Sequence, residues 1–65
     1  MSDVETLKAE VKKLSTQAIQ AKMDLHDLSE ELPVNWERIP EVAKACHDLY
    51  ARLTDARARL KAAGG

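Results

Sequence analysis

The greatest variety of reactive side chains lies between residues 22 and 27, in the run Lys-Met-Asp-Leu-His-Asp. An ammonium group, a thioether, two carboxylates and an imidazole stand within less than two helical turns. This combination can contact a partner protein or help to bind a metal ion, because carboxylates and imidazoles are metal ligands and an exposed methionine suits a contact surface. The alternative is that these residues form the solvated face of an amphipathic helix.

His26 and Glu30 are the candidate metal ligands. Their i, i+4 spacing places both side chains on one face of a helix, where they can share a divalent cation. Two ligands are too few for a specific site, so a second copy of the chain would have to complete it. An ordinary polar pair at this spacing is the preferred interpretation. We therefore expect no cofactor, with a divalent metal ion as the alternative.

Cys46 and His47 are adjacent and could suggest a nucleophile and its base. Consecutive residues on a helix point about 100° apart, however, so Cys46 would lie on a buried stripe while His47 points away from it. The sequence also lacks a glycine-rich phosphate loop, a paired-histidine zinc motif and a candidate triad. We predict that the protein is not an enzyme and has no catalytic residues.

Two long apolar stripes must position these residues. Nine apolar residues from Val4 to Leu32 follow one another at alternating spacings of three and four, and eight do so from Ile39 to Ala63. This heptad pattern predicts two helices that pack through a shared seam, over about 3–32 and 39–63. The chain is therefore expected to be all-α, a single domain over 1–65 that folds as a two-helix antiparallel coiled-coil hairpin.

The turn between the predicted helices follows Leu32. Pro33 stops the first helix, since the residue before a proline is displaced from the α region. Asn35 is placed to cap the next helical segment, and the three residues that begin at Trp36 predict a short 3₁₀ turn. The indole of Trp36 is expected to cover the end of the hairpin by packing on Leu32 and Ile39, and anchoring a partner is the alternative.

Folding at this turn brings the two stripes into one register. Alanines face leucines, as in the layer of Ala18 and Leu53, which gives the alternation of large and small residues that a packed core needs. The flanking pairs are Glu10 with Arg59, Glu31 with Arg38, and Gln17 with Arg52. One flank of the seam remains open to water. We predict that two hairpins dimerise into a four-helix bundle, and a bundle with a different protein is the alternative.

Size and charge restrict the kind of partner. The chain has 65 residues, a net charge of −1 and one cysteine. It shows no secretory leader and no apolar run of about 20 residues that could span a membrane, so we expect a cytoplasmic protein. Acidic residues are interspersed among the lysines, which argues against nucleic acid. RNA binding through Lys8, Lys12, Lys13 and Lys22 is the second alternative.

Three stretches of the sequence resemble a known family. They are Leu-Lys-Ala-Glu-Val-Lys-Lys-Leu at 7–14, Gln-Ala-Lys-Met-Asp-Leu-His-Asp-Leu at 20–28, and Glu-Leu-Pro at 31–33 followed by Trp36. Over about residues 5–55 the chain resembles the small Rop-like proteins of bacterial nitrogen-fixation gene clusters. The resemblance implies a two-helix hairpin that dimerises, a link to nitrogenase or to its assembly or protection, and for some members a bound metal.

The resulting hypothesis is a non-enzymatic accessory or adaptor protein of nitrogen fixation, built on a homodimeric bundle. Its partner would be nitrogenase or a nitrogenase assembly or protection factor. A metal-binding or metal-delivery protein is the alternative. The segment from 22 to 27 is chemically richer than the seam requires, so the contact surface is expected there. The candidate partner-binding residues are Lys22, Met23, Asp24, His26, Asp27 and Trp36.

Overall fold

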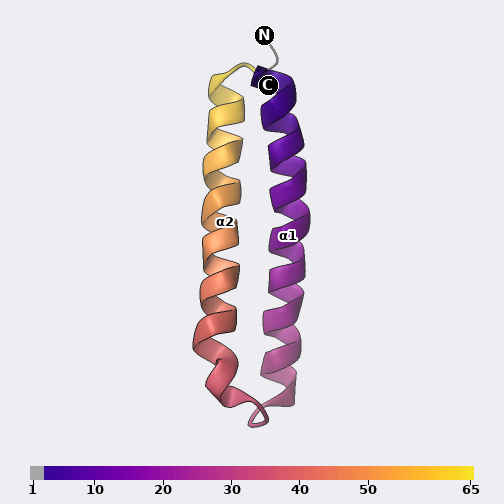
Figure 1. The fold of residues 1–65 in the computed structure, drawn as a ribbon, viewed down its shortest axis with the longest axis vertical. Coiled ribbons are helices and arrows are strands. Elements are labelled where there is room, and N and C mark those ends of the chain that lie inside the picture. The colour runs from indigo at the N-terminus through magenta and orange to yellow at the C-terminus, as the bar shows by residue number, and fades with distance from the viewer. Residues whose placement is uncertain (1–2) are drawn as a thin grey trace.

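The computed structural model describes residues 3–65, which form two antiparallel helices joined by a short turn (Figure 1). Helix α1 spans Asp3–Glu31, a 3₁₀ segment η1 spans Trp36–Arg38, and α2 spans Ile39–Ala62. The helices lie side by side in a rod of 50 × 14 × 12 Å. We call the end with the turn the closed end and the opposite end the open end. The predicted all-α hairpin is confirmed, with helix bounds correct to within one residue.

The turn reverses the chain through a left-handed residue. Helix α1 ends at Glu31, and Leu32 follows it at the position before a proline, where the α region is disfavoured. Asn35 has φ 62°, which asparagine tolerates better than most residues. Its carbonyl accepts a hydrogen bond from the N–H of Arg38 (2.9 Å) at the predicted 3₁₀ turn. The prediction that Asn35 caps the next helical segment through its side chain is wrong, because this side chain makes no capping hydrogen bond. Asn35 instead reverses the direction of the backbone.

Helix α2 ends in a Schellman motif. Gly64 has φ 92°, a conformation that a side chain would strain. The N–H of Gly65 donates to the carbonyl of Leu60 (2.9 Å), and the N–H of Gly64 donates to the carbonyl of Lys61 (3.1 Å). These bonds satisfy two carbonyls that lack partners within the helix, so they fix where α2 stops.

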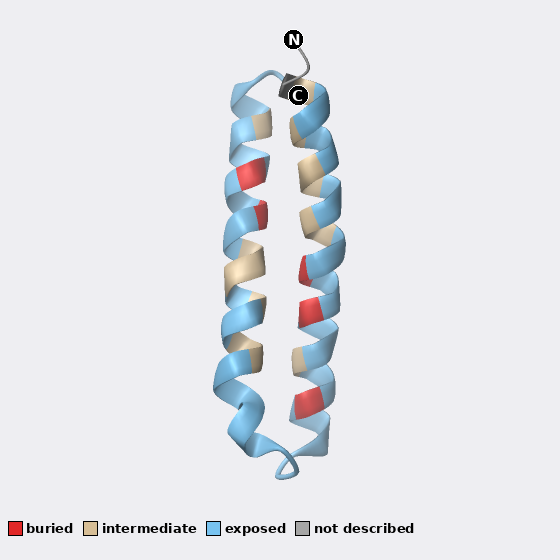
Figure 2. Ribbon diagram, viewed as in Figure 1, coloured by how far each residue is buried: buried red, intermediate tan, exposed pale blue. Residues whose placement is uncertain are grey.

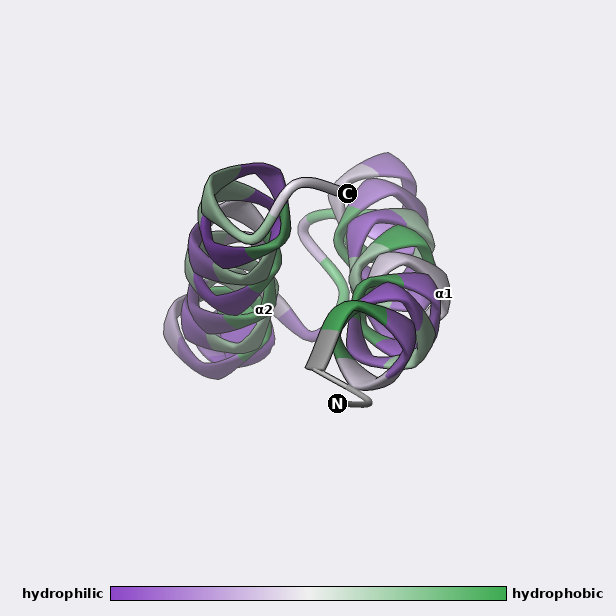
Figure 3. Cartoon of the chain, turned by 90° about the horizontal axis from the view of Figure 1, so that it is seen from above, coloured by the Kyte–Doolittle hydropathy of each residue, from purple (hydrophilic) through white to green (hydrophobic). Residues whose placement is uncertain are grey.

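A narrow apolar seam between α1 and α2 forms the core (Figure 2). Within residues 3–65 only five side chains of this seam are buried, and most of the remaining seam positions are half-buried. Viewed along its length, the molecule is a single layer of two helices, so either flank of the seam faces outward (Figure 3). Within residues 3–65 neither helix carries an apolar run long enough to cross a membrane. The buried apolar residues are Ala18, Ala21, Leu28, Leu53 and Ala56.

Trp36 does not cover the end of the hairpin, so this first interpretation of the residue is wrong. Its side chain is 60% exposed, and the neighbours on which it was expected to pack, Leu32 and Ile39, are exposed as well. The last buried side chain of α1 is Leu28, so the turn extends beyond the core. The chain also reverses at Asn35, immediately before the indole. No buried layer therefore lies beneath it.

Candidate functional site

The predicted contact residues of α1 spread over a broad outward arc of the helix, and Trp36 lies apart from them in η1. Asp24 and Asp27 line a groove between the two helices. Lys22 and Met23 are exposed but do not line this groove, since adjacent helical residues point about 100° apart. Met23 lies one turn from Ile19, and both side chains are about half exposed. The segment therefore offers two surfaces, one acidic and one apolar.

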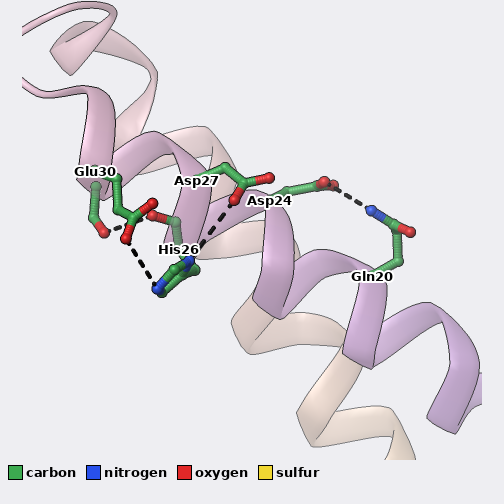
Figure 4. A network of polar contacts seen from close by, with 6 residues as sticks. Gln20, Asp24, His26, Asp27 and Glu30 are labelled. Atoms are coloured by element: carbon green, nitrogen blue, oxygen red, sulfur yellow. Dashed lines mark hydrogen bonds and ion pairs between the residues drawn. The ribbon is translucent and has the colours of Figure 1, made fainter.

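His26 lies between two carboxylates on the exposed surface of α1 (Figure 4). Its Nδ1 is 3.7 Å from Oδ1 of Asp27, and its Nε2 is 3.6 Å from Oε2 of Glu30. One ligand atom from each of the three residues lies within 4.8 Å of the others. The predicted pair of His26 and Glu30 is thus brought together, and Asp27 is a third possible ligand that spacing alone did not indicate.

This His26 cluster places one carboxylate beside each ring nitrogen and is not arranged as a closed metal centre. A metal ion binds one ring nitrogen, whereas the two carboxylates face different nitrogens. All three side chains are well exposed. The groups could hold a divalent cation only after a carboxylate moves to the other side of the ring, and a second copy would have to supply further ligands.

Cys46 and His47 do not form a catalytic pair. Cys46 is half-buried in the seam, while His47 is exposed and places its Nδ1 3.2 Å from Oδ1 of Asp48. Lys44 donates a hydrogen bond of 2.7 Å to the same carboxylate. The hydrogen bonds from Lys44 and His47 hold the pKa of Asp48 below its ordinary value. The histidine therefore belongs to a surface ion-pair group on α2.

A groove of about 480 Å³ lies between the helices near the turn. Its buried or half-buried floor includes Leu28 and Val42, and its rim is mainly acidic. Sequence reasoning missed it, although residues 24, 31, 38 and 45 occupy one heptad position and so mark one flank of the seam. We call it the closed-end groove. It is lined by Ala21, Asp24, Asp27, Leu28, Glu31, Arg38, Glu41, Val42 and Ala45.

A second groove, of about 610 Å³, lies on the same flank near the open end and has a different charge pattern. Here Nη2 of Arg59 lies 3.0 Å from Oε1 of Glu10, and its Nε lies 3.1 Å from Oδ2 of Asp55. The contact between Glu10 and Arg59 confirms the predicted register. We call this the open-end groove, and its lining is Ala9, Glu10, Lys13, Leu14, Gln17, Arg52, Asp55 and Arg59.

The predicted pair of Glu31 and Arg38 is not formed. Both residues line the closed-end groove, but within residues 3–65 no ion pair joins them. The pair would have to bridge the helices where α1 has already ended and the turn begins. Three acidic side chains of this groove, Asp24, Glu31 and Glu41, therefore have no cationic partner among the described residues.

Fold and surface together define a small helical-hairpin protein whose candidate sites are open grooves and exposed side-chain clusters. The chain belongs to the Rop-like family, whose sequence model matches residues 2–64. The resemblance found in the sequence is thereby confirmed.

Several curated relatives carry only a family designation. A UPF0437 protein of Azorhizobium caulinodans is 59% identical over 61 residues, which cover 94% of this chain and 88% of the relative. A relative in Sinorhizobium fredii is 45% identical over 62 residues and covers 95% and 92% of the two chains. A Frankia alni protein, 39% identical over 51 residues (78% and 62%), is named for its position in a nifX-nifW intergenic region. No solved structure matches this chain.

Proposed function

We propose that this Rop-like protein is a non-enzymatic accessory protein of nitrogen fixation that acts by binding another protein. One observation carries the proposal, namely that the Frankia alni relative is named for its place in a nifX-nifW intergenic region. Neighbouring bacterial genes commonly serve one process, and the stretches at 7–14 and 20–28 resemble proteins of nitrogen-fixation clusters. The partner in this proposal is nitrogenase or a factor that assembles or protects it.

Exposed apolar side chains support binding as the mode of action. Six large apolar side chains within residues 3–65 are exposed, and four of them lie in and beside the turn. Gathered apolar residues on a surface are typical of interaction sites, and tryptophan is among the residues that contribute most to interface energy. Trp36 at the turn and Met23 on α1 are the proposed apolar anchors, and the charged residues between 22 and 27 lie beside Met23. The four at the turn are Leu32, Val34, Trp36 and Ile39.

The partner can be tested by affinity purification from nitrogen-fixing cells. The tagged wild-type protein is expected to capture a nitrogenase-related protein. Separate Met23→Ala, Asp24→Ala and His26→Ala variants report on the helix-α1 surface, and Trp36→Ala reports on the turn. At least one variant should lose the captured protein while it keeps its helical circular dichroism. Identical captured proteins with all four variants would contradict the proposed contact residues.

We also propose that the protein is a homodimer. Its accessible surface is 4975 Å² for a mass of 7.2 kDa. A compact monomer of this mass would expose about 4,100 Å². The excess is close to the share of about 800 Å² that each partner buries in an interface of standard size. A second hairpin packed on the seam would bury such an area and would complete a four-helix bundle.

Metal binding is the second candidate function, because the His26 cluster holds three possible ligand groups within 4.8 Å. Titration calorimetry with Zn²⁺, Ni²⁺ and Fe²⁺ tests this candidate, and His26→Ala is the matched control. Binding through the cluster should be abolished by the substitution. If the metals bind His26→Ala as tightly as the wild-type protein, the candidate is removed.

A further inference from the structure

We propose that the closed-end groove binds a basic amphipathic helix of a partner protein. The acidic rim would contact Lys or Arg side chains, and the apolar floor would contact the apolar stripe of the bound helix. This inference deepens the proposed function and rests on it only in taking a protein as the occupant. It assigns the groove rather than the His26 cluster as the partner site, and it specifies the partner's charge.

Charge is distributed unequally along the rod, and this distribution selects a cationic occupant. Residues 20–50, which form the closed-end half, contain seven Asp or Glu and three Lys or Arg. The rest of the chain contains four acidic and seven basic residues. A groove at the acidic end therefore lies in a field that attracts cationic segments and repels acidic ones.

The two grooves differ in whether their own charges are paired. In the open-end groove Arg59 contacts both Glu10 and Asp55, so its central charges are satisfied within the hairpin. In the closed-end groove Glu31 and Glu41 make no ion pair within residues 3–65. Complementary charges from outside the chain can therefore be accommodated at the closed end without breaking an internal pair.

The shape of the floor favours a helix as the occupant. The groove follows the line between α1 and α2, and its floor combines Leu28 and Val42 with the small residues Ala21 and Ala45. Small residues permit close approach of a third helix, and an amphipathic helix buries its apolar stripe in a groove of this kind. The aliphatic stems of Lys and Arg can cover the remaining apolar surface while their charged ends reach the rim.

A second copy of the chain can occupy the other flank of the seam and leave this groove free. The groove residues at 24, 31, 38 and 45 occupy the g position of the heptad, and the e position lies on the opposite flank. Ser15, Ala43 and Tyr50 occupy e positions and are already half-buried. The e positions hold no acidic residue and include Lys8, Lys22 and Arg57, so this flank differs in charge from the groove and would not attract the same basic occupant.

Titration calorimetry with two synthetic peptides tests the proposal on the full chain. The probe is an amphipathic peptide with leucine at heptad a and d positions and lysine elsewhere, and its control carries glutamate in place of lysine. The groove variant is Asp24→Asn, Glu31→Gln and Glu41→Gln. A charge-matched control variant is Glu5→Gln, Glu37→Gln and Asp48→Asn, which are acidic residues outside the groove and outside the His26 cluster.

The lysine peptide should bind the wild-type protein and the control variant with similar Kd, and the groove variant should bind about tenfold more weakly. The glutamate peptide should not bind. Equal weakening in both variants would overturn the proposal, because it would indicate unspecific attraction. Loss of self-association in the groove variant would also overturn it, since a second copy would then be the occupant. These outcomes leave the capture of a nitrogenase-related protein as a separate test.

Discussion

Asn35 and Gly64 have the two backbone conformations that few side chains adopt without strain, with φ 62° and 92°. Gly64 follows the C-cap Ala63 of α2, at the position where glycine is common because it adopts the left-handed conformation without strain. Asn35 was interpreted as a side-chain cap, because asparagine favours both helix caps and left-handed turns. Only the course of the chain between Pro33 and Trp36 distinguishes the two roles.

Asn35→Val tests the backbone role of this residue. A β-branched side chain disfavours the left-handed region, so the free energy of unfolding should fall by about 1–2 kcal/mol in chemical denaturation. Asn35→Gly is the control and should leave stability unchanged or raise it, because glycine adopts this φ freely. An equal loss in both variants would instead indicate that the amide side chain is important.

The pH dependence of Asp48 provides a second test at the scale of one residue. Hydrogen bonds from Lys44 and His47 lower its pKa below 3.8 in the folded protein. Because the pKa is lowered in the folded protein, ionised Asp48 stabilises the fold above about pH 3.8. This stabilisation is lost as the pH falls through the pKa of Asp48 in the folded protein. Carboxyl NMR titration should show the pKa of Asp48 rising toward 3.8 in Lys44→Met. An unchanged value would contradict the assigned contact.

At the scale of the elements, the heptad spacing predicted both helices, and the ion pair of Glu10 and Arg59 confirms their register. The exposed position of Trp36 was not predicted, because spacing does not reveal that burial ends at Leu28, before the turn. The closed-end groove was not predicted either, because it forms only where side chains of α1 and α2 meet. Spacing along one helix grouped residues 22–27, but it did not indicate that only Asp24 and Asp27 among them line the groove.

Leu53→Ala and Leu32→Ala measure how far the core extends. Leu53 is 3% exposed, so Leu53→Ala should lower the free energy of unfolding by about 2–5 kcal/mol, because the substitution leaves a cavity in the seam. Leu32 is 40% exposed, so Leu32→Ala should lower the free energy of unfolding by clearly less than Leu53→Ala. Chemical denaturation at a fixed protein concentration gives both values. Similar losses would show that the core continues to the closed end.

At the scale of the whole molecule, the hairpin is a thin rod with a half-buried seam and an excess of acidic residues toward the turn. The two features imply different contacts. The flank around Tyr50 is the proposed contact of a second copy, and the closed-end groove is the proposed site for a basic helix. Binding at one flank would leave the other accessible, so a homodimer could present two grooves to its partners.

Sedimentation equilibrium tests the first of these contacts. The wild-type chain is expected to be a dimer at micromolar concentration. Tyr50→Glu places a charge at this contact and should shift the equilibrium toward monomer by at least about tenfold in Kd. The groove variant should remain dimeric. A wild-type protein that stays monomeric across this range would contradict the proposed homodimer.

We propose that this Rop-like protein supports nitrogen fixation by binding a protein partner. Acetylene reduction by a nitrogen-fixing host that lacks the gene tests it most directly. Activity should fall on deletion and recover with the wild-type gene or the charge-matched control variant, but not with a stably folded variant that combines Trp36→Ala with the groove substitutions. Unchanged acetylene reduction and unchanged growth on N₂ after deletion would contradict the claim.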